Sequence, residues 1–489
     1  MKLIASIFDN FRCFKEYSLV YGKEATVIIG KNGTGKSSIL SAIRRGLSFM
    51  FARPQEFPKN LSSNATVRTF EKGEANFDPI HRVFNYPIEN SFKAKFGAEV
   101  LEWSMLKNSQ NGVYSKNLYK HALAKILGAY NEDLKTRLPV FSVLTDSFPH
   151  QMMNFGTKVK KTIGQDVLPR DLAYYGWDER TNCIELWLNR FYKVSNFETD
   201  RFDEIRAAKS QIKIQERRLE ETDEKDSHRL GQIREAIARG RERLQYLQSD
   251  KRIAVFTNER NYIANKLLDF TKPLAQAYPF VNKEFEISNV PVRRPDKKTY
   301  VLEFEFADGR VIPFDALPMG YKRVFGMVLD IAYRSFILNE DIESEGIVLI
   351  DEIEMHLHPT LQQEILQRFK RTFPQIQFIV TTHSPLVISN FKADGDNIII
   401  KLEQDGNKYW NENVENVYGI DYATNLTEVM EAAPRASTID KYINAYLFLY
   451  GRKQNGRAED MLQKLREYIG GEIPKKLQEE INFKKRAYQ

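Results

Sequence analysis

The sequence predicts an α/β fold, in which buried strands form a large head that carries a helical insertion and a helical C-terminal region. Three observations predict it. The apolar run 27–29 leads into a glycine-rich loop and a helix-like stretch. The apolar runs 347–350 and 377–382 each end in polar residues, as central strands of a parallel sheet do. Residues 200–251 have a helical composition without proline.

Length and composition are those of an ordinary globular protein. The chain of 489 residues is too long for one core, and 42% of its residues are hydrophobic and 28% charged. No stretch approaches the roughly 18 apolar residues that span a bilayer, and the first residues acquire charge too early for a signal peptide. Two cysteines, Cys13 and Cys183, fit a reducing cytoplasm. The net charge of +7 permits contact with DNA or RNA without requiring it.

The loop GKNGTGKS has the spacing of a phosphate-binding loop. Its pattern is G-x-x-x-x-G-K-[ST], and it lies between a predicted strand and a predicted helix, as that motif requires. Backbone N–H groups and a helix N-terminus then surround a triphosphate, so a nucleotide is the expected ligand. The candidate nucleotide-binding residues are Gly30, Lys31, Asn32, Gly33, Thr34, Gly35, Lys36, Ser37 and Ser38.

Two carboxylates and a histidine follow the later apolar runs. Asp351 and Glu352 end one predicted strand, and His383 ends the next. A carboxylate at such a strand end can hold Mg²⁺ together with the hydroxyl of Ser37. Its neighbour can orient or deprotonate the attacking water. His383 would then lie beside the γ-phosphate. We therefore expect Ser37 and Asp351 as metal ligands, and Glu352 and His383 as catalytic residues.

We predict four segments along the chain. The N-terminal lobe of the head takes 1–195, and within it we expect a helix and a strand, PVFSVLT. A helical hairpin takes 196–265, the C-terminal lobe takes 266–402, and a helical region for partner or oligomer contacts takes 403–489.

The insertion has the pattern of two helical arms. Residues 200–251 contain 25 charged residues, 13 basic and 12 acidic. Arms of about twenty residues would reach roughly 30 Å, and 222–228 would form a polar tip. A single solvated helical excursion remains an alternative. The seam of the second arm comprises Leu230, Ile233, Ile237, Leu244 and Leu247 with Gly240 at one position, and the weaker face of the first arm comprises Phe202, Ile205, Ile212 and Leu219.

The order of these motifs resembles the ABC-type ATPase heads of the RecF, Rad50 and SMC class. The resemblance covers roughly 1–50 and 300–402 and includes the segment TTHSP. Within that class NFRCF, GYKRVFGMVLDIAYR, DEIEMHLHP and YGIDYATNLTEVM are similar to the PtuA-like ATPases of Septu and retron antiphage systems.

The resemblance implies roles for individual residues. Lys36 would contact the β- and γ-phosphates, Arg12 would lie near the nucleotide, and His383 would sense the γ-phosphate. A signature segment would complete the site from a second subunit, so that ATP joins two heads of a homo-oligomer. Its positions here are Leu317, Met319, Gly320 and Tyr321. Pro318 departs from the family pattern, because proline supplies neither a hydroxyl nor a backbone donor, and this predicts slow hydrolysis.

The resemblance also implies a function. An ATPase of this kind would regulate a separate effector nuclease in antiphage defence, with a small HNH-type nuclease of the PtuB kind as its partner. Two alternatives remain: a DNA repair ATPase that binds DNA directly, and an ATP-binding scaffold with little hydrolysis. We expect no nuclease activity in this chain, because its seven histidines form no such constellation. His356 and His358 have a poor zinc spacing. Asp394-Gly395-Asp396 is interpreted as a turn.

Overall fold

The structure is a computed structural model in which the chain forms two compact units, Met1–Tyr418 and Gly419–Gln489. Each unit is described by itself. No helix among the described residues is both long and apolar enough to cross a membrane. The described residues are 1–112, 117–145, 155–178, 183–223, 226–274, 284–294, 299–340, 342–415, 417–432 and 435–486.

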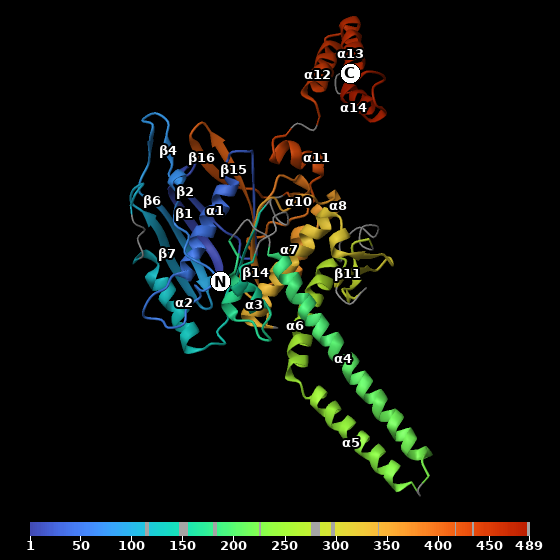
Figure 1. The fold of residues 1–489 in the computed structure, drawn as a ribbon. Coiled ribbons are helices and arrows are strands. Elements are labelled where there is room, and N and C mark those ends of the chain that lie inside the picture. Colours follow the sequence, from blue (N-terminus) through green and yellow to red (C-terminus); the bar gives the residue numbers. More distant parts are fainter. Residues whose placement is uncertain are drawn as a thin grey trace. The chain divides into compact units, whose positions relative to one another are not determined.

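A six-stranded sheet forms the centre of the larger unit (Figure 1). All its pairings are parallel except the antiparallel one between β15 and β16, the two strands that come last in the sequence. The predicted strand PVFSVLT is confirmed as its edge strand β8, and the apolar residues of the inner strands are buried on both faces. In spatial order the strands are β16 (Lys408–Asn413), β15 (Asn397–Asp405), β3 (Ala25–Gly30), β14 (Ile376–Thr381), β13 (Gly346–Ile350) and β8 (Val140–Leu144).

A second, antiparallel sheet packs on helix α1 (Lys36–Leu47), which also contacts β3 and β14 of the first sheet. A Cβ on Gly46 would lie 2.3 Å from the Phe92 ring, and Trp103 Nε1 donates to the Gly46 carbonyl at 2.9 Å. Glycine therefore lets α1 approach this sheet closely. Its strands, in spatial order, are β2 (Phe14–Val20), β1 (Lys2–Phe11), β6 (Ile88–Phe96) and β7 (Glu99–Lys107).

The predicted helical hairpin is confirmed (Figure 1). Helices α4 (Ile184–Glu221) and α5 (Ser227–Gln248) pack through Ile212, Ile233 and Ile237, so the alternative of one unpartnered excursion was wrong. Gly240 lies in this seam, because a Cβ there would come within 2.9 Å of Ile212. Helix α6 (Lys251–Thr271) returns the chain to the head. Residues 224–225 of the expected tip lie outside the described residues.

Helix α4 begins well before the predicted boundary at 196. Its first turns belong to the head, where the Trp187 ring stacks on Tyr333 at a centroid distance of 5.2 Å. Tyr333 lies on α7 (Met319–Asn339). Charge density marks where the hairpin leaves the head, and it carries no signal for the buried part of the same helix.

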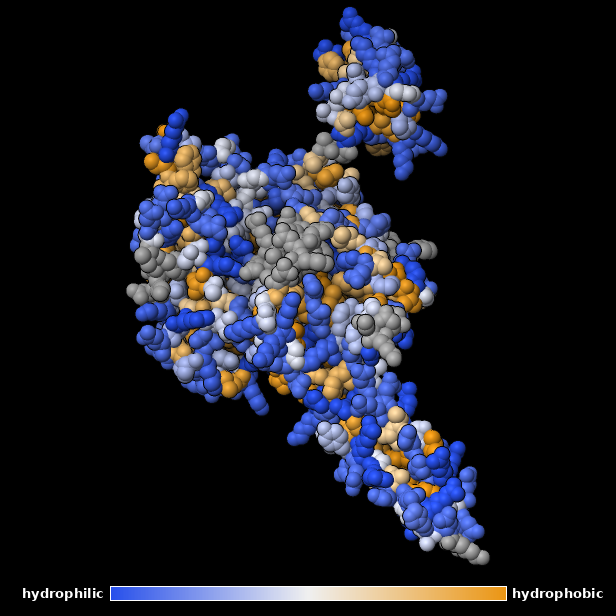
Figure 2. All heavy atoms as spheres, in the orientation of Figure 1, coloured by the Kyte–Doolittle hydropathy of each residue, from blue (hydrophilic) through white to orange (hydrophobic). Residues whose placement is uncertain are grey.

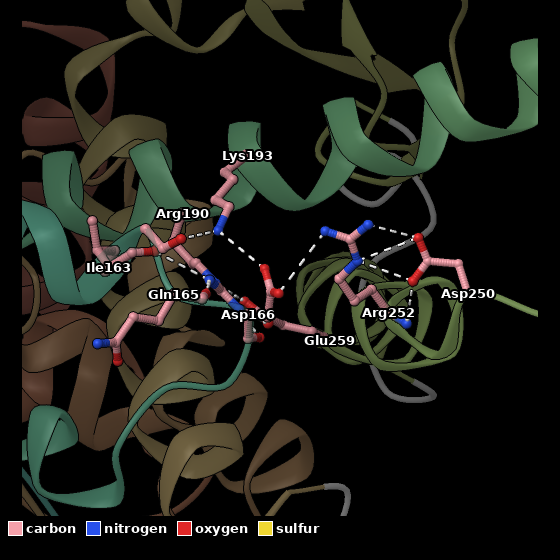
Figure 3. Close-up of polar contacts among 9 residues, drawn as sticks. Ile163, Gln165, Asp166, Arg190, Lys193, Asp250, Arg252 and Glu259 are labelled. Atoms are coloured by element: carbon pink, nitrogen blue, oxygen red, sulfur yellow. Dashed lines mark hydrogen bonds and ion pairs between the residues drawn. The ribbon is translucent and has the colours of Figure 1, made fainter. Parts of the chain in front are cut away.

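Ionic contacts fix the base of the hairpin (Figure 3). The buried Arg190 of α4 forms a two-bond pair with Glu259 of α6, each bond 2.7 Å long, and donates to the carbonyls of Ile163, Gln165 and Asp166. The Asp166 carboxylate also lies 3.7 Å from Lys193 of α4 and 4.0 Å from Arg252 of α6. Helices α4 and α6 are therefore joined to each other and to residues 163–166 at one place.

The smaller unit is helical, but it starts later than the predicted boundary at 403. Strands β15 and β16 lie within residues 397–413 and belong to the main sheet. Strand β15 pairs with β3, and its Leu402 is buried there. The unit contains α11 (Tyr422–Thr424), a π-turn (Asn425–Val429), α12 (Ser437–Gly451), α13 (Asn455–Ile469) and α14 (Lys475–Arg486). Its buried side chains are Ile443, Tyr446, Leu447, Ala458, Leu462, Leu465 and Ile481.

A buried carboxylate joins three elements of the head. Asp330 of α7 accepts hydrogen bonds from Ser142 of β8 at 2.6 Å, Trp187 of α4 at 2.7 Å and Arg334 at 2.8 Å. All four side chains are buried. Loss of the carboxylate would leave Arg334 in the core without its counter-charge.

We predict that Asp330→Ala destabilises the head by about 3–5 kcal/mol, the usual cost of breaking a buried ion pair. The measurement is the melting temperature of the full chain. Asp203→Ala is the control, because Asp203 forms only an exposed pair with Arg206. Equal melting temperatures for the two variants would contradict the prediction.

Candidate functional site

Three glycines of the loop, Gly30, Gly33 and Gly35, have a positive φ, and at Gly30 and Gly35 a side chain would also collide with its neighbours. Gly30 has φ of 149° and Gly35 has φ of 101°. A Cβ on Gly30 would lie 2.7 Å from the Leu402 carbonyl oxygen, and one on Gly35 would lie 2.5 Å from the Phe14 ring. These contacts explain why the motif needs glycine there.

Lys36 lies inside this loop. Its Nζ donates to the carbonyls of Gly30 at 2.7 Å and Lys31 at 2.9 Å. Burial lowers the pKa of Lys36 below its ordinary value, although the charges of Asp351 and Glu352 oppose the shift. Lys36 also begins α1, whose N-cap Gly35 has no side-chain acceptor. The positive end of the helix therefore adds to the charge of the ammonium group.

A cavity of about 360 Å³ joins the loop to the later strand ends. The structure brings together here most of the residues that the sequence predicts. Gly30, Lys31 and Thr34 shape the loop without lining the cavity, and the signature-like residues Leu317, Met319, Gly320 and Tyr321 are not among the described residues that line it. The lining residues are Arg12, Cys13, Asn32, Gly33, Gly35, Lys36, Ser37, Ser38, Asp351, Glu352 and His383.

Thr381 holds the two carboxylate residues in place. Its hydroxyl at the end of β14 donates to the Asp351 carboxylate and accepts from the Glu352 N–H at 2.9 Å. Glu352 has a left-handed backbone with φ of 50°, a conformation that non-glycine residues rarely adopt. The neighbouring strand therefore fixes the sharp turn that carries both acids.

Sequence reasoning missed Glu354, which positions the histidine loop. Its carboxylate accepts from the Thr382 hydroxyl and from the His383 N–H, both at 2.7 Å. His383 itself is exposed at the cavity. The only signal was a third carboxylate within DEIEMH, and nothing in the spacing assigns it to the loop after β14.

The sequence also gave no sign of Cys13 as a lining residue. A Cβ on Gly35 would lie 2.9 Å from its Sγ, which places Cys13 directly under the phosphate loop. Burial raises the pKa of the Cys13 thiol to about 11, so it stays protonated at neutral pH.

Arg12 reaches the cavity from the turn between β1 and β2. Its guanidinium donates to Glu74 at 2.7 Å, and Arg45 of α1 contacts the same carboxylate at 2.7 Å. Burial alone would raise the pKa of Glu74, but Arg45 and the hydrogen bonds outweigh it and lower the pKa. The predicted position of Arg12 thus depends on an acid that the sequence did not single out.

Arg323 links α7 to the acidic turn. It is buried and donates to the carbonyls of Asp351 at 3.1 Å, Glu352 at 2.9 Å and Met355 at 2.9 Å. One turn earlier, a Cβ on Gly320 would lie 2.3 Å from the His356 carbonyl oxygen. The start of α7 therefore packs against the backbone that follows Glu352.

Pro318 is the N-cap residue of α7, which begins at Met319. The cap has no side-chain hydrogen bond. The Pro318 side chain therefore offers no hydrogen-bond acceptor to the first N–H groups of α7.

Comparison with known proteins gives consistent relationships. A family described as AAA ATPase domain matches residues 1–388. "Retron Vc95 probable ATPase" of Vibrio cholerae serotype O1 biovar El Tor is 28% identical over 410 residues, which are 78% of this chain and 70% of that protein. "Septu protein PtuA" of Bacillus mycoides is 31% identical over 155 residues, 31% of this chain and 21% of that protein.

A solved structure also matches, at low sequence identity. The Smc head domain of Pyrococcus furiosus, with an extended coiled coil and bound to the C-terminal domain of ScpA, has 12% identity and a TM-score of 0.44. The matched region covers 85% of this chain and 96% of the chain in that structure. The predicted similarity to retron and Septu ATPases is confirmed. The predicted fold class, an α/β ATPase head with a helical-hairpin insertion and a helical C-terminal region, is confirmed as well.

We predict that Arg323→Met speeds hydrogen exchange of the amides in 351–357. Three carbonyls would lose their donor, and each unsatisfied buried group costs about 1–3 kcal/mol. Hydrogen exchange measured by mass spectrometry checks the prediction. Lys322→Met is the matched control, since the Lys322 side chain donates to the Asp315 carbonyl at an exposed position, away from 351–357. Equal exchange in both variants would contradict the role of Arg323.

Proposed function

Because the chain belongs to the AAA ATPase domain family, we propose that it binds ATP with Mg²⁺ in the cavity beside Lys36 and hydrolyses it slowly. One observation carries the proposal. A single cavity is lined both by the phosphate loop and by acidic and histidine side chains from two neighbouring strand ends. Phosphoryl transfer needs just these elements, namely a phosphate cradle, a metal ligand and a group that activates water.

The residues present fit the ligand. Lys36 would exchange its two loop carbonyls for phosphate oxygens. The Ser37 hydroxyl and the Asp351 carboxylate are hard oxygen donors on one cavity, the type that Mg²⁺ prefers. When bound, Mg²⁺ would neutralise phosphate charge and orient the transferred group.

Glu352 and His383 would act at the γ-phosphate. Glu352 would accept a proton from the attacking water, and the Thr381 hydroxyl keeps its backbone in the required turn. His383 would sense the terminal phosphate, with Glu354 holding its backbone N–H. Arg12 would lie at the edge of the nucleotide.

We further propose that the site is completed by a second copy of the chain. The signature-like residues of the same chain do not line the cavity, which supports their use in another subunit. ATP would then join two heads of a homo-oligomer. Pro318 offers neither a hydroxyl nor a backbone donor to the phosphate, so turnover would be slow. The same observation favours a second candidate function, an ATP-binding scaffold with little hydrolysis.

The relatives support a role in antiphage defence. The names of the similar proteins refer to retron and Septu systems. We propose that this ATPase regulates a separately encoded effector, a small HNH-type nuclease, in such a system.

We predict that Lys36→Ala abolishes the rise in melting temperature that ATP produces. Glu352→Gln should still bind ATP, while kcat falls by about 10²–10⁴-fold because the base is lost. Nucleotide-dependent melting and phosphate release measure the two effects. Lys15→Ala, an exposed change on β2, is the control. Undiminished turnover of Glu352→Gln would contradict the assignment of the base.

Co-purification with the product of the neighbouring gene, with and without ATP, tests the partner. The Glu352→Gln chain should retain the nuclease. Two results together would instead support direct action in DNA repair. The nuclease would not be retained, and the chain alone would bind DNA strongly, with an affinity that falls steeply as salt is raised.

We predict that Pro318→Ser raises kcat several-fold. Serine restores a hydroxyl and an N–H at the start of α7, and it is a favourable N-cap residue. Phosphate release at saturating ATP measures the effect. Pro313→Ser is the control. Like Pro318, Pro313 is an N-cap residue, here of the short 3-10 helix Phe314–Ala316, but it lies outside the signature-like segment. Unchanged turnover would favour the scaffold.

A further inference from the structure

A short hairpin of the larger unit exposes an unusual number of large apolar side chains. Strands β4 (Phe77–Asp78) and β5 (Val83–Phe84) form it, and the Phe77 and Phe84 rings contact each other at 5.2 Å. Figure 2 shows hydrophobic side chains gathered at this hairpin. Single exposed apolar residues are common, whereas several together indicate an interaction surface. The exposed fractions are 47% for Phe77, 83% for Ile80, 50% for Val83 and 42% for Phe84.

The hairpin is joined to the rim of the nucleotide cavity. Before the hairpin, the Asn76 N–H donates to the Asn10 carbonyl at 2.8 Å, and the Asn76 side-chain amide donates to the Arg12 carbonyl at 2.8 Å. The Arg12 N–H donates to the Glu74 carbonyl at 2.7 Å. After the hairpin, the Pro87 carbonyl accepts from the Asn10 side chain at 2.9 Å. The base of the hairpin is therefore fixed to the turn that carries Arg12 and Cys13.

The chemistry of the hairpin favours a protein partner. Asp78 accepts three hydrogen bonds, two of them from His81. Residues 77–84, all of them described by the structure, contain a single Arg or Lys, which is Arg82. Nucleic acid binding needs clustered cations, and this surface does not offer them.

A second copy of the chain offers a matching surface. Val311 of β12 (Val311–Pro313) is 54% exposed, and Met319 is 42% exposed. Met319 belongs to the signature-like segment and Val311 precedes it in the chain. That segment must face the cavity of the other subunit if the heads close on ATP. The hairpin at the rim of that cavity and these apolar residues would then lie on facing sides of the same interface.

We propose that the hairpin formed by residues 77–84 packs against the signature-like side of a second copy and stabilises the ATP-bound pair of heads. This inference rests on the proposed function, since it requires heads that close on ATP. The apolar contact adds affinity that does not depend on the phosphate, which would offset the missing donors at Pro318.

Dimerisation of full chains in the Glu352→Gln background tests the proposal. Ile80→Asp should weaken the ATP-dependent dimer at least tenfold without changing ATP affinity, and Val311→Asp should do the same from the opposite side. Mass photometry over a concentration series gives the dimer dissociation constant. Val167→Asp is the matched control, because Val167 is 72% exposed and belongs to neither surface.

Each outcome decides one of the two ideas. The inference is supported if Ile80→Asp and Val311→Asp both weaken the ATP-dependent dimer and Val167→Asp does not. If Ile80→Asp dimerises like its parent, the inference is wrong even though the heads close. An Ile80→Asp chain that dimerises normally but loses the co-purifying nuclease would assign the hairpin to that partner instead. If the Glu352→Gln parent forms no dimer with ATP, the proposed head closure itself fails.

A mixture of two single-cysteine additions gives independent support. Chains with Ile80→Cys and chains with Val311→Cys should cross-link to each other through a short bismaleimide only when ATP is present. Chains with Val167→Cys replace the Ile80→Cys chains in the control. Absence of the cross-link in a mixture that dimerises would overturn the inference.

Discussion

The parallel pairing of β3, β14 and β13 is the constraint on which the site depends. Parallel strands deliver their carboxyl ends to one edge, so the glycine-rich loop, the acidic turn and the histidine loop must meet there. Thr381 then fixes the local detail, because its hydroxyl serves both Asp351 and Glu352. A one-residue change in the register of β14 would separate this hydroxyl from both partners.

Helix α7 connects the site to the remainder of the head. Its first turns contact the backbone after Glu352 through Gly320 and Arg323. Farther along, Asp330 and Tyr333 hold the buried end of the hairpin helix α4. One helix therefore contacts both the base of the hairpin and the turn that carries both acids.

The strands and the core of the site could be predicted because their signals are local. A loop with fixed glycine spacing and apolar runs that end in carboxylates need no knowledge of distant contacts. Glu354, Glu74 and Arg323 could not be found in this way, because each contacts a group far along the chain. Glu354 and Arg323 bind backbone groups, and Glu74 binds the Arg12 guanidinium. The start of α4 and the end of the main sheet were misplaced for the same reason, since tertiary burial decides them.

The bonds from Lys36 to the carbonyls of Gly30 and Lys31 have a thermodynamic consequence. The loop holds the Lys36 ammonium through its own hydrogen bonds, so the proposed nucleotide binding would exchange the partners of an ordered group and would not have to order a segment. Little conformational entropy is then lost on association. The affinity for nucleotide would therefore depend mainly on charge interactions, and so on salt concentration. Folding of the loop would contribute little to its temperature dependence.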